Sequence, residues 1–154
     1  MLPFLLIFLL CSLPGCSSGQ DFVHVERVVD GDTFVIAGGG RVRMIGIDTP
    51  ETVHPERPVE PFGPEASAFA KQLLDGNNVR LEFDVQERDK YGRLLAYVFL
   101  EDGRFANAEL VREGLATVLT IPPNVRYVDL FVRLQREARL EGRGMWREGE
   151  RIED

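Results

Sequence analysis

Three short blocks of this 154-residue sequence contain residue types that suit metal-assisted chemistry on a phosphate group. The blocks are residues 29–33, 43–51 and 89–93. They hold the carboxylates Asp30, Asp32, Asp48 and Glu51 and the arginines Arg43 and Arg93. If the fold brings the blocks together, the carboxylates can hold a hard divalent cation while the arginines bind a phosphate.

The residue types themselves narrow the chemistry. Neighbouring carboxylates raise one another's pKa and resist ionising together unless a positive charge lies among them. Oxygen-only ligands favour Ca²⁺ or Mg²⁺ over zinc or iron, and the planar guanidinium of arginine matches two phosphate oxygens. Taken singly, Asp30, Asp32 and Asp48 also fit ordinary turns, because Asp-Gly and Asp-Thr-Pro are common loop sequences.

The order and spacing of the blocks resemble those of the staphylococcal nuclease (thermonuclease) family. Residues 62–69 and 95–97 match the same pattern, and the resemblance runs from about Val23 to Trp146. It implies an α+β fold, in which a five-stranded oligonucleotide/oligosaccharide-binding barrel packs with about three helices. Barrels of this type recurrently bind nucleic acid, although the fold alone does not establish a function.

The resemblance also implies a role for each residue. Asp32, Asp48 and the Thr49 carbonyl would ligate Ca²⁺, Asp30 would support the site through water, and Glu51 would orient or deprotonate the attacking water. Arg43 and Arg93 would bind the phosphate and stabilise its growing charge, while Lys90 and Tyr91 would contact the nucleotide. The implied reaction is metal-dependent endonuclease cleavage of DNA and RNA with little sequence specificity, leaving 3′-phosphate ends.

One segment departs from the family. Residues 119–123 read Leu-Thr-Ile-Pro-Pro, where the family typically presents tyrosines. A base stacked on an aromatic ring is worth ~1–3 kcal/mol. We therefore predict a raised Michaelis constant and little base preference, with the chemical step intact.

Two other functions are open to the sequence. His24 and His54 could cleave RNA as a metal-free acid–base pair, but neither has an evident orienting partner. The chain could also be a membrane-anchored barrel that binds nucleic acid with weak catalysis. Retention of the complete charged set favours the nuclease over that binding module.

The first sixteen residues predict export. Residues 1–10 are almost wholly apolar, and Leu13-Pro14-Gly15-Cys16 follows them, which is typical of a signal segment rather than a membrane span. The Leu-x-Gly-Cys ending resembles a bacterial lipoprotein cleavage site and predicts lipidation of Cys16. The alternative is a cleaved secretory signal without lipid. Cys11 and Cys16 are the only cysteines, so processing would leave no disulfide pair.

The remaining residues fit one domain. We predict a short linker at 17–21, the nuclease-like domain at 22–147 and a charged tail at 148–154, in a chain that acts as a monomer. The net charge of −7 disfavours tight binding of nucleic acid, which is itself strongly negative. A bound divalent cation would offset part of this field.

Periodicity and turn residues predict the elements that position the site. Strands are expected at 22–29, 33–37, 41–47, 79–85 and 95–99, and helices at 64–74 and 106–113. Asn124 is expected to cap a third helix, whose buried stripe would be Val128, Phe131, Leu134 and Ala138. The first three strands form a meander that should bring Asp32 and Asp48 together.

Overall fold

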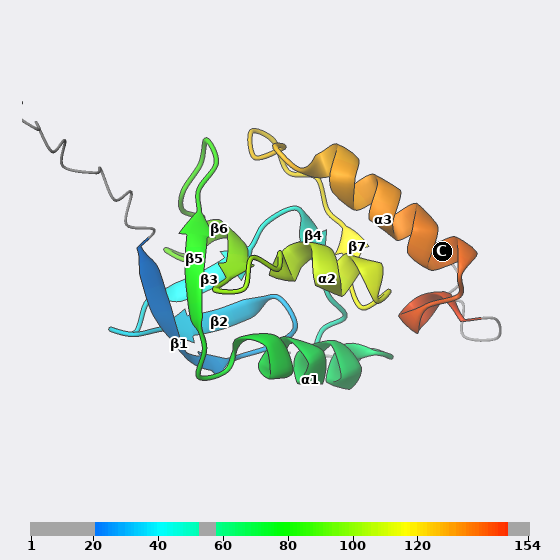
Figure 1. Cartoon of the computed structure of the whole chain (residues 1–154), viewed down its shortest axis with the longest axis horizontal. Coiled ribbons are helices and arrows are strands. Elements are labelled where there is room, and N and C mark those ends of the chain that lie inside the picture. Colours follow the sequence, from blue (N-terminus) through cyan, green and yellow to red (C-terminus); the bar gives the residue numbers. More distant parts are fainter. Residues whose placement is uncertain (1–20, 53–57, 148–154) are drawn as a thin grey trace, which may run out of the picture.

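The computed structural model describes residues 21–52 and 58–147. Five strands close into a barrel in the order β1-β2-β3-β6-β5, shown on the left of Figure 1. They are β1 (Phe22–Val28), β2 (Thr33–Ile36), β3 (Arg41–Met44), β5 (Asn78–Glu82) and β6 (Leu94–Leu100). Every neighbouring pair is antiparallel except β3 and β6, which run parallel.

Three helices flank the barrel, and they confirm the predicted α+β class. They are α1 (Gly63–Leu74), α2 (Ala106–Arg112) and α3 (Val128–Leu140), followed by the short 3₁₀ helix η1 (Gly144–Trp146). In Figure 1, α1 runs along the base of the barrel, while α2 and α3 lie to its right. None of the helices in the described ranges is long and apolar enough to cross a membrane.

The predicted strand at 41–47 is interrupted, and this interruption shapes the site. Gly46 has a φ of 81°, and the Phe131 ring lies 2.5 Å from the position that a β-carbon at Gly46 would occupy. A larger residue would be strained there and would collide with that ring. The chain therefore leaves the barrel after β3 and forms β4 (Ile47–Asp48), which pairs antiparallel with β7 (Thr117–Val118).

The predicted cap of the third helix is wrong. Helix α3 begins at Val128 after Tyr127, without a side-chain cap, whereas Asn124 is buried in the preceding loop. The Asn124 amide accepts a hydrogen bond from the Gln86 N–H at 2.8 Å and donates one to the Gln86 carbonyl at 2.7 Å. Asn124 thus joins the loop before α3 to the loop after β5. Its side-chain amide can do this because, like a backbone peptide, it has both a donor and an acceptor.

Most other element boundaries agree with the sequence to within a few residues, although the strand expected at 79–85 ends at Glu82. The core contains Phe34, Tyr97 and Phe131, each with at most 1% of its surface exposed. Phe131, Leu134 and Ala138 form the buried side of α3, as predicted, whereas Val128 is only partly buried. The leader at 1–16, most of the predicted linker and the tail at 148–154 lie outside the described residues.

Candidate active site

The first part of the site is the tight turn between β1 and β2. The Asp32 N–H donates to Asp30 Oδ1 at 3.1 Å, which holds the Asp30 carboxylate against the Asp32 backbone. Gly31 lies between them, and a β-carbon there would lie 2.6 Å from Thr49 Oγ1. Only glycine allows the turn to approach the segment after β4 this closely.

Asp32 connects this turn to the end of β4. Its Oδ2 accepts hydrogen bonds from the Thr49 N–H and the Thr49 hydroxyl, each at 3.0 Å, and its Oδ1 accepts one from the Thr33 hydroxyl at 3.1 Å. Asp32 is 5% exposed. The three donors stabilise a buried carboxylate that would otherwise be costly.

Arg43 lies between two carboxylates. Its Nη2 atom is 3.1 Å from Asp32 Oδ2 and 2.8 Å from Asp48 Oδ1, while Nη1 donates to the Ile47 carbonyl at 3.0 Å and to the Met44 carbonyl. The Arg43 side chain is only 14% exposed. These contacts orient the guanidinium group and confirm that the fold brings Asp32 and Asp48 together.

The carboxylates outnumber the cations at this point. Burial, followed by the charge of Asp32, raises the pKa of Asp30 to about 6. Loss of hydration raises the pKa of Asp48, even though 55% of its side-chain surface is exposed; Arg43 opposes the rise, and Asp32, Glu60 and Glu51 add to it. Such a surplus of negative oxygen donors suits a hard divalent cation.

The donor set fits a cation that completes its shell with other oxygens. Asp32 and Asp48 flank one nitrogen atom of Arg43, and Thr49 directly follows Asp48 in the chain. No group of three or more His, Cys, Asp or Glu side chains within 21–52 and 58–147 converges as a complete metal site. Water and substrate oxygens would therefore have to supply the remaining ligands, as is usual for Mg²⁺ and frequent for Ca²⁺.

Glu51 lies two residues beyond Thr49, near the same carboxylates. Its charge contributes to the raised pKa values of both Asp30 and Asp48, which places it within electrostatic reach of each. The Glu51 N–H donates to Glu60 Oε2 at 3.0 Å. The structure thus brings the expected water-activating residue to the edge of the Asp32–Arg43–Asp48 group.

The second arginine comes from the loop between β5 and β6. Asp89 Oδ2 accepts a hydrogen bond from Arg93 Nε at 2.7 Å, and its Oδ1 accepts from the N–H groups of Tyr91 and Arg93 at 2.9 and 3.0 Å. The Tyr91 ring is 73% exposed and lies 5.0 Å from Lys90 Nζ and 5.6 Å from the Arg93 guanidinium carbon. Asp89 was not among the predicted site residues, although its spacing from Arg93 is a recognisable signal.

A cavity of about 310 Å³ connects the two arginines. Arg43 and Arg93 both line it, together with Lys90, Tyr91, Leu119 and Ile121. Arg43, Lys90 and Arg93 contribute positive charge to its wall, while Leu119 and Ile121 contribute aliphatic surface. This composition suits a phosphate with an adjoining nucleoside.

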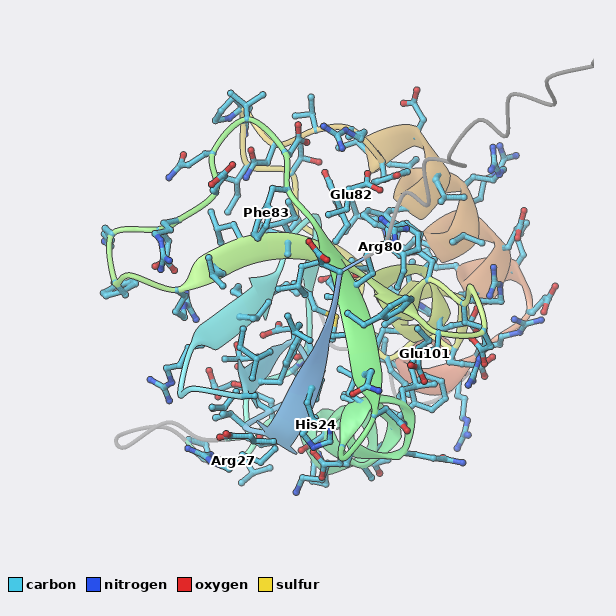
Figure 2. All side chains as sticks on the ribbon, turned by 60° about the vertical axis from the view of Figure 1, so that its left-hand side comes forward. His24, Arg27, Arg80, Glu82, Phe83 and Glu101 are labelled. Atoms are coloured by element: carbon cyan, nitrogen blue, oxygen red, sulfur yellow. The ribbon has the colours of Figure 1, made fainter. Side chains whose placement is uncertain are left out.

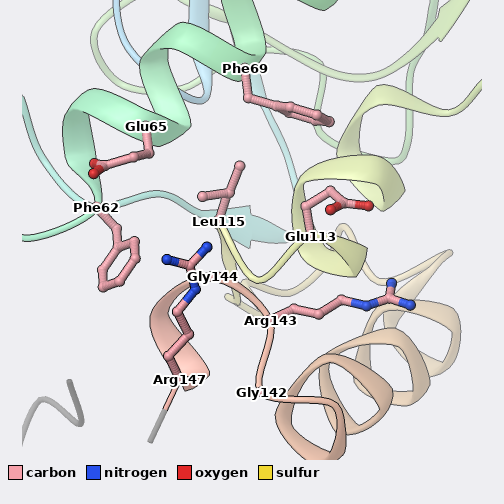
Figure 3. Close-up of a pocket in the computed structure, with 9 residues that line it drawn as sticks. All are labelled: Phe62, Glu65, Phe69, Glu113, Leu115, Gly142, Arg143, Gly144 and Arg147. Carbon is pink, nitrogen blue, oxygen red and sulfur yellow. The ribbon is translucent and has the colours of Figure 1, made fainter. Parts of the chain in front are cut away.

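A second cavity, of about 440 Å³, contains none of the predicted site residues. Figure 3 shows it between the start of α1 and the C-terminal segment, with Phe62, Leu115 and Arg147 among its lining residues. It contains both Glu and Arg side chains and shows no convergence of one charge sign. The larger cavity is therefore not where the charged blocks meet.

The structure offers little support for an imidazole pair. His24 lies on β1, on the outer surface of the barrel shown in Figure 2, and its Nδ1 is 3.2 Å from Asn78 Oδ1. His54 lies outside the described residues. His24 does not line the cavity that Arg43 and Arg93 share.

The closed barrel, the flanking helices and the carboxylate–arginine site define a barrel protein of the oligonucleotide/oligosaccharide-binding type. The model of the staphylococcal nuclease homologue family matches residues 41–148. Thermonuclease of Staphylococcus intermedius is 50% identical over 131 residues, which cover 83% of this chain and 77% of that protein. Thermonuclease of Staphylococcus hyicus is 46% identical over 133 residues, covering 84% and 78%.

A more distant relative extends the comparison. Endonuclease YncB of Bacillus subtilis is 41% identical over 129 residues, which cover 80% of this chain and 61% of that protein. The chain belongs to the staphylococcal nuclease family.

Proposed function

We propose that the chain is a Ca²⁺-dependent endonuclease that hydrolyses DNA and RNA with little sequence preference and leaves 3′-phosphate ends. Family membership makes it a nuclease that hydrolyses phosphodiester bonds. The observation that carries the proposal is the placement of Arg43 between Asp32 and Asp48, on the same cavity as Arg93.

The charged groups divide the chemistry between them. Asp32, Asp48 and the Thr49 carbonyl would hold the cation, with Asp30 supporting them through water, and a bound cation would supply Lewis-acid stabilisation of the phosphate. Arg43 and Arg93 bind the non-bridging phosphate oxygens and stabilise the charge that builds during attack. Glu51 orients a water molecule and accepts its proton.

The cavity wall determines how the nucleoside is bound. Lys90 supplies a positive charge, and Tyr91 supplies an exposed ring beside the sugar or base. Leu119 and Ile121 add aliphatic contact but no π-face. Affinity for the base should therefore be modest, and discrimination among bases weak.

Digestion of single-stranded DNA tests the proposal. The native protein should cleave with Ca²⁺ and lose activity with a chelator, and the Glu51→Gln variant should be strongly impaired. End-group analysis of the products should find 3′-phosphates, and RNA should be cleaved under the same conditions. Equal inactivity of native and variant protein, with DNA binding retained, would instead support the weakly catalytic binding module.

We also propose that the protein is exported, anchored to the membrane through a lipid on Cys16, and monomeric. The Leu-x-Gly-Cys sequence supports the anchor, because fatty-acyl chains on a cysteine can tether a protein to a membrane without a spanning helix. Mass spectrometry of the mature N-terminus would identify the lipid. An unlipidated N-terminus beyond Cys16 would indicate a secreted protein.

A further inference from the structure

Glu51 lies outside regular secondary structure, yet two hydrogen bonds join it to a single residue. The Glu51 N–H donates to the Glu60 carboxylate at 3.0 Å, and the Glu60 N–H donates to the Glu51 carbonyl, also at 3.0 Å. Glu60 therefore contacts both polar groups of the Glu51 backbone. Rotation of the chain at Glu51 would break at least one of these bonds.

Glu60 is itself held at the start of α1. The Gly63 N–H donates to the Glu60 carbonyl at 3.0 Å. A β-carbon at Gly63 would lie 3.1 Å from the Glu51 carbonyl oxygen and 2.7 Å from Thr52 Cγ2, so the two segments approach each other closely. Phe62 precedes the helix with a φ of 65°, a conformation that non-glycine residues seldom adopt.

Helix α1 ties Glu60 to the hydrophobic core. Its buried residues include Ala66, Ala70 and Leu74, which have no exposed surface. The Ala66 N–H also donates to the Phe62 carbonyl at 2.9 Å, so the first helical turn is formed directly beside Glu60. The position of Glu60 is thus set by the hydrophobic core through α1.

A carboxylate at position 60 also has an electrostatic cost. Glu60 is near enough to Asp48 for their like charges to interact, at a place where negative groups are already crowded. A neutral residue would avoid that repulsion. The hydrogen bond from the Glu51 N–H to the Glu60 carboxylate can offset this repulsion, because a carboxylate forms a stronger hydrogen bond with a backbone N–H than a neutral acceptor does.

We propose that Glu60 is a positioning residue, which holds Glu51 at its working distance from the Arg43–Asp48 pair. This inference rests on the proposed function, in which Glu51 directs the attacking water. Glu60 need not touch the substrate or the reacting atoms. Its effect should appear in kcat and depend on Glu51, because misplacement by about 1 Å can reduce a rate by ~10²-fold.

The test is a double-mutant cycle on the full-length chain, with single-stranded DNA and saturating Ca²⁺. Glu60→Ala removes the acceptor, and we expect kcat to fall about 10- to 100-fold with KM within about twofold of native. Glu60→Gln keeps an acceptor oxygen at the same length, and its kcat should stay within about threefold of native. In the Glu51→Gln background, Glu60→Ala should change kcat by less than about twofold.

Two controls separate positioning from folding. Glu65→Ala, in the exposed first turn of α1, should have native kcat. Melting temperatures of all variants should show that each is folded at the assay temperature. Rescue by Glu60→Gln would then be inconsistent with a general loss of structure.

The outcomes distinguish the two proposals. Native kcat in Glu60→Ala, or an equal loss of kcat in the native and Glu51→Gln backgrounds, would overturn the positioning role while leaving the proposed function intact. Full activity in Glu51→Gln would overturn the role of Glu51 itself, and the role of Glu60 with it. Loss in Glu60→Ala, rescue in Glu60→Gln and no further loss on Glu51→Gln would support the inference.

Discussion

Two of the carboxylate–arginine clusters in the molecule differ in how well their charges are matched. At the candidate active site, Arg43 is shared by Asp32 and Asp48, and the pKa values of Asp30 and Asp48 are raised. The other region, which we call the β5 cluster, lies at the end of β5, where Figure 2 shows Glu82. It consists of Glu82, Asp84, Tyr97, Arg126 and Tyr127.

In the β5 cluster each carboxylate has several donors. Glu82 Oε1 accepts from Arg126 Nη1 at 2.8 Å and from the Tyr127 hydroxyl at 2.7 Å, and Asp84 Oδ2 accepts from the Tyr97 hydroxyl and the Arg126 N–H, both at 3.1 Å. Burial alone would raise the pKa of Glu82 and of Asp84, but these hydrogen bonds outweigh it and lower both.

The difference shows what each region does. The β5 cluster satisfies its charges internally and joins β5 to the loop before α3, so its contribution is to stability. At the candidate active site, Asp30 and Asp48 have fewer donors and raised pKa values, so a bound cation would supply the positive charge that they lack. Among residues of the same types, the balance of donors and acceptors separates a structural cluster from a functional one.

Exchanging arginine for glutamine in each region gives the sharpest test of this comparison. Arg43→Gln should lower kcat/KM by about 10²- to 10³-fold, since it removes a preorganised charge from the transition state. Arg126→Gln should leave kcat/KM within about threefold and lower the melting temperature instead. Steady-state digestion of DNA measures the first effect. Equal losses of activity in the two variants would mean that the regions are not functionally distinct.

The second test concerns stability. Asp84→Ala should lower the free energy of unfolding by about 1–3 kcal/mol, because the Tyr97 hydroxyl and the Arg126 N–H lose their acceptor. The Asp84 side chain is only 7% exposed. Urea denaturation measures the change, and the kcat of the folded variant should be native. Asp102→Ala is the matched control, because Asp102 forms a solvent-exposed pair with Arg104 and its loss should leave the free energy of unfolding nearly unchanged.

The β5 cluster should also make stability depend on pH. The folded-state pKa values of Glu82 and Asp84 are below their ordinary values, so the stabilising effect is complete above the unfolded-state values, near pH 4. It is lost as the pH falls through the lower, folded-state values. The free energy of unfolding should therefore rise with pH across this acid range. Urea titrations of Glu82→Gln/Asp84→Asn should show a shallower rise, and an unchanged slope would contradict the assignment.

The sequence predicted those features that depend on local pattern. Alternation of apolar and polar residues indicated the five barrel strands, and Pro64 indicated the start of α1. The three charged blocks identified a set that the fold does assemble, because each block lies at or beside the end of a barrel strand. The roles of the individual residues as metal ligands or phosphate-binding groups stay predictions.

The features that sequence reasoning missed depend on contacts between distant segments. Asn124 resembled a helix cap, but its amide binds Gln86, 38 positions earlier. The break at Gly46 depends on the Phe131 ring, which reaches it from α3. The β5 cluster unites residues more than 40 positions apart. No local spacing signals such partners, because they meet only after the barrel has closed.

The last prediction concerns the loop that joins the two regions, and its effect should be the smallest. Residues 119–127 line the active-site cavity at Leu119 and Ile121 and reach the β5 cluster at Arg126 and Tyr127. Ile121 is 61% exposed, so a larger side chain can be accommodated. Ile121→Tyr would add a π-face for the base and should lower KM about fivefold, near the weak end of the ~1–3 kcal/mol range for stacking.

This prediction is specific because KM should fall while kcat stays unchanged. Because the added ring binds a part of the substrate that does not react, it stabilises ground state and transition state equally, and kcat should not change. Val132→Tyr is the control, since Val132 is exposed on α3 and does not line the cavity. A lower KM in both variants would mean that an added aromatic ring raises the affinity for DNA wherever it lies on the surface. A lower KM in Ile121→Tyr alone, at native melting temperature, would show that the cavity end of the loop governs substrate affinity while its other end governs stability.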